Sequence, residues 1–220
     1  MATHQLILKP LALAGLLAGL LACASATHAA ITVYTTPASF AAATSAVATD
    51  TFNGEPLGGP NFPHVGTAGP YGYSADATFD GIYFVGSVAD VWLSTTSPAE
   101  TVTFYDLTGG ASALGGNFFA TDFDGAVLPG LQMTLSASNG PDTVTHTLFN
   151  SSAASFVGFV SDQPLLRMTV DAATPTSGDS FATVNDLRLG LVASAVPEPA
   201  TWALMLAGVG LVGTRLRRSV

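Results

Sequence analysis

Between residues 31 and 191 the chain repeats short runs in which apolar and polar residues alternate, with turn-forming residues between the runs. In the clearest run, Leu-Gln-Met-Thr-Leu-Ser at 131–136, every second side chain is apolar. This spacing predicts a half-buried strand with one face in water. The same reasoning predicts strands at Ile31–Thr35, Thr49–Phe52, Ala77–Val85, Val91–Thr95, Thr101–Leu107, Asn117–Phe123, Leu131–Ser138, Thr143–Phe149, Ser155–Ser161, Leu165–Asp171 and Ala182–Leu191.

Three other features predict how these strands are connected. Asn139-Gly140 predicts a tight hairpin between the strands on either side of it. Thr36 is predicted to cap a short helix that has Pro37 in its first turn, Phe40 facing inward and an end near Ala46. Residues 54–72 include six glycines and four prolines, which predicts a long loop.

Many short strands and one short helix predict an all-β fold. The expected architecture is a two-sheet β-sandwich of jelly-roll or lectin-like type, with an immunoglobulin-like sandwich as the alternative. This domain is predicted to span residues 30–195.

The charge of this region narrows its function. Residues 31–196 hold fourteen acidic side chains and two basic ones, Arg167 and Arg188, for a net charge of 2 − 14 = −12. Such a surface repels phosphate backbones, so nucleic acid is not expected as a partner. It suits a soluble extracellular domain, or one that collects divalent cations.

The first 29 residues are predicted to be a signal peptide. Lys9 and the amino terminus form a positive region, residues 11–21 form an uncharged apolar run, and small residues follow, with cleavage after Ala29 or Ala30. A second interpretation is lipidation, because Leu20-Leu21-Ala22-Cys23 resembles a lipobox. Under signal cleavage the exported domain keeps no thiol, since Cys23 is the single cysteine.

Residues 196–220 contain three parts in order. Val-Pro-Glu-Pro is stiff and extended, because two prolines fix φ and remove donors. Residues 201–214 carry no charge and predict a membrane helix that spans only ~20 Å, shorter than the ~30 Å apolar core of a bilayer. The arginines at the end are expected to stay in the cytoplasm, which places the domain outside.

This tail resembles the PEP-CTERM sorting signal, whose pattern is Val-Pro-Glu-Pro, a short apolar helix and a basic end. The resemblance implies processing by an exosortase in a Gram-negative host that makes exopolysaccharide. It also implies that the domain passes through the periplasm on a temporary inner-membrane anchor, and then reaches the cell surface or extracellular matrix. The matching positions are Pro197, Glu198, Pro199, Trp202, Leu206, Gly208, Gly210, Arg215, Arg217 and Arg218.

Residues suited to catalysis are few. A glycosidase needs two carboxylates that flank one bond, and Asp122 and Asp124 form the candidate pair because positions i and i+2 of a strand share a face. The alternative is that both lie in a solvated turn at Asp124-Gly125. His64 and His146 have no second ligand at metal spacing. A non-enzymatic protein is therefore the first expectation, and a secreted hydrolase that acts on glycans is the weakest alternative.

Two binding sites remain as hypotheses. A structural calcium ion is predicted at Asp50 and Asp186, with help from Asn53, where the first and last strands of the sandwich would pair. Tyr71 and Tyr73 flank a glycine in the predicted loop and would stack on a sugar if they were exposed. The resemblance of the tail to a PEP-CTERM signal, together with the few catalytic residues, implies a matrix protein associated with exopolysaccharide, with a glycan-binding, lectin-like module as the alternative.

Overall fold

The structure is a computed structural model that describes residues 30–61, 63–79 and 81–194. The predicted signal peptide and membrane helix lie outside these residues. The elements are β1 (Ile31–Tyr34), α2 (Pro37–Ala43), β2 (Thr44–Asp50), β3 (Gly58–Asn61), β4 (His64–Ala68), β5 (Tyr71–Ala77), β6 (Ile82–Ser87), β7 (Asp90–Thr95), β8 (Val102–Tyr105), β9 (Ala113–Thr121), β10 (Met133–Ser138), β11 (Thr143–Leu148), β12 (Phe156–Ser161), β13 (Arg167–Ala172) and β14 (Phe181–Val192).

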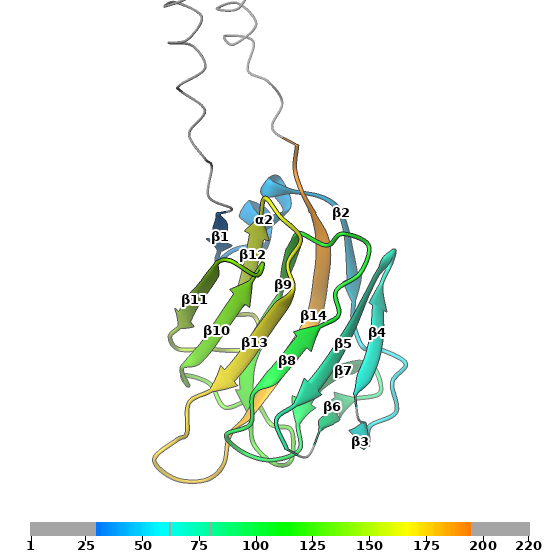
Figure 1. The fold of residues 1–220 in the computed structure, drawn as a ribbon. Coiled ribbons are helices and arrows are strands. Elements are labelled where there is room, and N and C mark those ends of the chain that lie inside the picture. The colour runs from blue at the N-terminus through cyan, green and yellow to red at the C-terminus, as the bar shows by residue number, and fades with distance from the viewer. Residues whose placement is uncertain (1–29, 62, 80, 195–220) are drawn as a thin grey trace, which may run out of the picture.

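The strands form two packed antiparallel sheets (Figure 1). One sheet has the order β1-β12-β9-β14-β7-β6-β3, with β2 also paired to β14, and the other has the order β11-β10-β13-β8-β5-β4. The predicted all-β fold, a two-sheet β-sandwich with one short helix, is confirmed.

The alternation of apolar residues places the core between the sheets. In β10, Met133, Leu135 and Ala137 are buried while the residues between them are partly exposed. Phe104 of β8 and Phe118 of β9 are fully buried from opposite sheets. One face of the six-stranded sheet therefore packs into the core, and the other face is in contact with solvent.

The short helix begins as predicted and ends earlier. Thr36 accepts a hydrogen bond from the backbone N–H of Ser39 and caps the helix, and Phe40 is buried. The helix stops at Ala43 rather than near Ala46. Residues 44–50 instead form β2, which pairs with β14 in the eight-stranded sheet.

The prediction of one long loop over residues 54–72 is wrong. This stretch contains β3, β4 and the start of β5. In β4 the side chains of His64 and Ala68 are buried, and a Cβ at Gly66 would overlap the phenol of Tyr73. Glycine is required at this position because the paired strand presses an aromatic ring against the backbone.

One predicted strand is divided in the structure, and one predicted hairpin is present. The run predicted as one strand, 77–85, is split by a turn, where Gly81 has a φ of 89°. The hairpin at Asn139-Gly140 is confirmed, and its N–H at Asn139 bonds to the carbonyl oxygen of Asp142.

Candidate functional site

The two tyrosines predicted to bind sugar are buried, so their prediction as exposed rings is wrong. Tyr71 and Tyr73 are each 2% exposed and lie on the core face of β5. The Tyr73 hydroxyl donates to Oδ2 of Asp50 at 2.7 Å. Burial, together with the charge of Asp50 and this bond, raises the pKa of the Tyr73 phenol. Both rings belong to the core rather than to a binding surface.

The residues predicted to hold calcium lie near the β2–β14 pair, where their side chains bond to backbone N–H groups or lie close to Arg188. β2 and β14 do pair, with Asp50 opposite Leu187. Oδ1 of Asp50 accepts from the N–H of Phe52 at 2.9 Å, and Oδ1 of Asn53 accepts from the N–H of Val91 at 2.9 Å. Oδ2 of Asp186 lies 3.9 Å from the Arg188 guanidinium. Within the described residues there is no group of three or more His, Cys, Asp or Glu side chains able to hold a metal ion.

The carboxylate pair Asp122 and Asp124 lies in a turn that follows β9, not on a strand face. Oδ1 of Asp122 accepts from the backbone N–H groups of Asp124 and Ala126, at 3.0 and 2.8 Å. Asp122 therefore organises the turn, and Asp124 is exposed. The position of both residues agrees with the alternative interpretation of this pair, a solvated turn.

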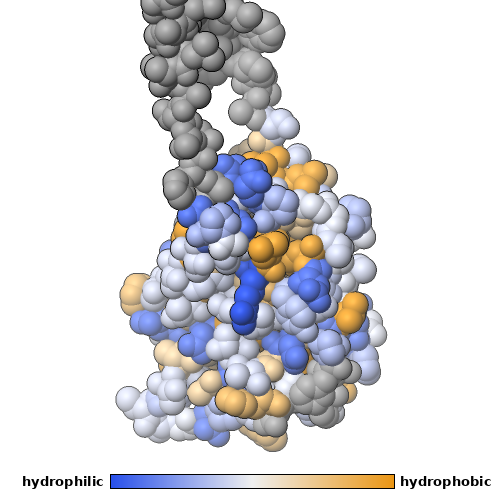
Figure 2. Space-filling view, viewed as in Figure 1, coloured by the Kyte–Doolittle hydropathy of each residue, from blue (hydrophilic) through white to orange (hydrophobic). Residues whose placement is uncertain are grey.

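The outer face of the six-stranded sheet contains a hollow of about 840 Å³ over β5, β8 and β13. Figure 2 shows this side of the molecule as mainly hydrophilic, with a small apolar group near its middle. The hollow is lined by Asp76, Ala77, Thr78, Thr103, Tyr105, Asp106, Leu107, Leu166 and Arg167.

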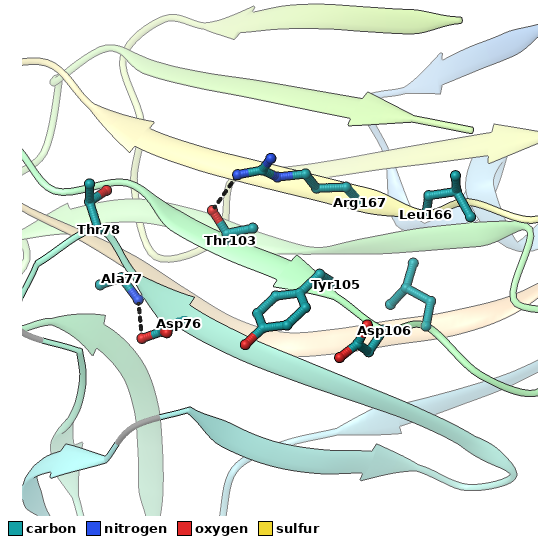
Figure 3. Close-up of a pocket in the computed structure, with 9 residues that line it drawn as sticks. Asp76, Ala77, Thr78, Thr103, Tyr105, Asp106, Leu166 and Arg167 are labelled. Carbon is teal, nitrogen blue, oxygen red and sulfur yellow. Dashed lines mark hydrogen bonds between the residues drawn. The ribbon is translucent and has the colours of Figure 1, made fainter. Parts of the chain in front are cut away.

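Strand pairing brings these side chains together from three distant segments. Asp76 of β5 pairs with Thr103 of β8, and Thr103 also pairs with Thr169 of β13. Nη2 of Arg167 donates to Oγ1 of Thr103 at 3.4 Å, so the guanidinium of β13 is turned toward β8 (Figure 3). Tyr105 lies below it in the same view, between Asp76 and Asp106.

The site has a mixed charge. Arg167 is one of two basic residues in the domain, and the other, Arg188, lies on the eight-stranded sheet over the ring of Phe156. Burial and the neighbouring carboxylates of Asp76 and Asp106 raise the pKa of the Tyr105 phenol, which is neutral at pH 7 even at its ordinary pKa. The hollow thus presents one positive group, two carboxylates and a neutral phenol.

The backbone holds Asp106 in an unusual geometry. Its φ is 51°, in the left-handed region that non-glycine residues seldom occupy. Aspartate tolerates this region better than most residues. The conformation turns the chain at the end of β8, where Asp106 joins the hollow.

A second hollow, of about 420 Å³, continues across the same face over β10 and β13. Arg167 lines both hollows. The second is lined largely by hydroxyl groups, and the hydroxyls of Ser136 and Thr145 hydrogen-bond at 2.8 Å. Together the two hollows form what we call the outer groove, with Arg167 at its centre.

Sequence reasoning missed the outer groove, although part of the signal was present. The alternation in residues 102–105 and 167–172 places Tyr105 and Arg167 on wet faces. A lone arginine on a strand of a strongly acidic domain is also unusual enough to notice. Which strands lie side by side is not visible in either pattern.

The predicted sorting residues, from Pro197 to Arg218, lie outside the described residues. In the described part of the chain no helix has the length and apolar character needed to cross a membrane. The chain matches the family model of the PEP-CTERM protein-sorting motif over residues 195–219. A specific sorting motif therefore follows the sandwich directly.

No curated protein matches the chain. Among solved structures it is similar to TmCBM61 in complex with β-1,4-galactotriose, with 9% identity and a TM-score of 0.36, over 53% of this chain and 86% of that one. It is also similar to the Agl-KA catalytic domain, with 15% identity and a TM-score of 0.36, over 66% of this chain and 31% of that one.

Proposed function

We propose that this chain, which carries a PEP-CTERM protein-sorting motif at residues 195–219, is an exported protein that an exosortase sorts to the cell surface or extracellular matrix. The motif is the observation that carries this proposal. The apolar leader at residues 11–21 supports it, because a signal peptide and a basic C-terminus give the same orientation in the membrane.

We further propose the domain boundaries 1–29 for the leader, 30–195 for the sandwich and 196–220 for the sorting signal. On this assignment the sandwich folds in the periplasm while the apolar segment holds it at the inner membrane. The end of β14 at Val192 supports the second boundary, because the regular structure stops just before the motif.

The sandwich is proposed to be a non-enzymatic domain associated with exopolysaccharide. Its net charge of −12 keeps it soluble and away from anionic surfaces. The Asp122 carboxylate is committed to backbone N–H groups of its own turn, which argues against a role for it in hydrolysis.

The test is the intact mass and the cell fraction of the protein in its native host. The variant Pro197→Ala/Glu198→Ala/Pro199→Ala removes the motif and leaves the apolar segment in place. A matched control, Thr176→Ala/Ser177→Ala/Asp179→Ala, changes three exposed residues of the β13–β14 loop.

We expect the wild type and the control to lose the residues after the motif and to leave the membrane fraction, while the motif variant keeps them. If all three proteins retain residues 201–218 and stay in the membrane, the tail is an ordinary anchor and the sorting proposal is wrong.

A further inference from the structure

We propose that the outer groove binds an uncharged saccharide chain, with Tyr105 as the stacking platform and with Asp76, Asp106 and Arg167 as hydrogen-bonding partners. This inference rests on the proposed function, in which the sandwich meets polysaccharide outside the cell. It moves the glycan contact from the buried tyrosines of β5 to the opposite, solvent-facing side of the same sheet.

Tyr105 provides a flat apolar surface in an open position. It lies on the solvent side of β8, whereas its neighbour Phe104 is fully buried. Leu166, which is 56% exposed, adds apolar surface to the same hollow. An aromatic ring with an apolar neighbour and a polar rim is the surface that the C–H faces of a sugar ring require.

The polar groups around the ring favour hydroxyls over other ligands. Carboxylates only accept hydrogen bonds and a guanidinium only donates them. A sugar hydroxyl does both, so neighbouring hydroxyls satisfy Asp76 and Arg167 at the same time. A carboxylate or sulfate on the ligand would meet two aspartates, and a cation would face Arg167, so the uncharged class fits best.

The shape of the outer groove favours a chain over a single sugar. It crosses the strands from β5 through β8 and β13 to β10, which are consecutive neighbours in the sheet. Three inter-strand steps span about 14 Å at about 4.8 Å each. The backbone groups of these central strands are paired within the sheet, so a peptide could not bind here by adding a strand.

Direct binding to the full chain tests the proposal. The protein is held in a detergent without a sugar headgroup, so that the detergent does not compete. The probes are maltotetraose, cellotetraose, galactotetraose and mannotetraose, with tetragalacturonate as the charged match, followed by saturation-transfer NMR and calorimetry. Tyr105→Ala, Tyr105→Phe and Arg167→Ala are compared with Tyr83→Ala, which changes a partly exposed tyrosine on the other sheet.

We expect at least one neutral tetrasaccharide to bind and its affinity to fall about tenfold or more in Tyr105→Ala and in Arg167→Ala. Tyr83→Ala should bind as the wild type does, and Tyr105→Phe, which keeps the aromatic ring, should lose less affinity than Tyr105→Ala. Thermal melting shows whether each variant folds. Binding by none of the neutral probes, binding by tetragalacturonate alone, or equal affinity in Tyr105→Ala would each overturn the proposal. The measurement does not involve processing, so it is independent of the mass test for sorting.

Discussion

Substitution of Glu100 best tests how the loops at one end of the sandwich are held together. Glu100 lies just before β8 and is 2% exposed. Oε1 accepts from the N–H of Phe79 at 2.8 Å, and Oε2 accepts from the N–H of Ser97 at 3.1 Å and from the Thr96 hydroxyl at 3.4 Å. One carboxylate therefore joins the β5–β6 turn to the β7–β8 loop.

The size of the effect follows from these bonds. A hydrogen bond to a charged group contributes about 1.5–3 kcal/mol, and part of the loss is recovered when water reaches the freed N–H groups of an exposed turn. Glu100→Ala should then lower the free energy of unfolding by about 2–4 kcal/mol. For a chain of this size that is a fall in Tm of roughly 4–16 °C.

Glu100→Gln separates the hydrogen bonds from simple packing. A glutamine keeps one acceptor for Phe79 but turns an amide NH₂ toward the N–H of Ser97, so about half of the loss should appear. Urea denaturation followed by circular dichroism measures both variants, with exposed Asp162→Asn as the control for loss of a negative charge. If Glu100→Gln is as stable as the wild type, the carboxylate does not hold the two loops and the reasoning is wrong.

Three further changes probe two core positions and one half-buried carboxylate, and each is measured by the Tm. His64→Phe should raise stability by about 1 kcal/mol, because Nε2 of His64 is buried among aromatic rings and has no hydrogen-bond partner among the described residues; a loss of stability would contradict this. Gly158→Ala should cost about 1–3 kcal/mol, since the new Cβ would overlap the ring of Phe40 in α2; an unchanged Tm would refute that contact. Burial raises the pKa of the Asp171 carboxyl above its ordinary value. Ionised Asp171 therefore lowers the free energy of unfolding, fully above the folded pKa and not at all below the unfolded pKa of about 3.9. Asp171→Asn should therefore raise the Tm at pH 7 and leave it unchanged at pH 3, and an equal gain at both would refute the assignment.

Strands in which large apolar residues alternate with small polar residues could be predicted from the sequence. In β10, large apolar residues alternate with serine and threonine, and the strand lies where the pattern places it. In β4 the buried positions hold histidine, glycine and alanine, so alternation is present but carries little apolar volume. Glycine there fits a close ring rather than a turn, and composition alone does not separate the two uses.

The burial of the two tyrosines of β5 was missed because of the same glycine-rich stretch. Tyr71, Tyr73, Ala75 and Ala77 all point inward, which is a regular period of two. The period starts inside the glycine-rich stretch, and a loop prediction for that stretch hid it. A pattern count carried across residues 71–77 would have placed both rings in the core.

The outer groove depends on information of another kind. Asp76, Tyr105 and Arg167 come from three strands that are distant in sequence, and they meet because β5 pairs with β8 and β8 pairs with β13. Alternation predicts which face of a strand is wet, but the choice of neighbouring strands depends on packing across the whole sandwich. The chemistry of a site on a sheet face is therefore visible in the sequence only one strand at a time.

The positions of the chain ends bear on how the outer groove would be presented. Ile31 pairs with Ser161, the N–H of Ser161 bonds to the carbonyl oxygen of Ser112, and the N–H of Val192 bonds to the hydroxyl of Ser112. Both ends of the sandwich therefore meet beside Ser112, at the same end of the molecule (Figure 1). On the proposed topology the sorting signal tethers the domain by this end alone. The outer groove lies across the strands on a side face, so it would be open to polysaccharide both before and after the tail is removed.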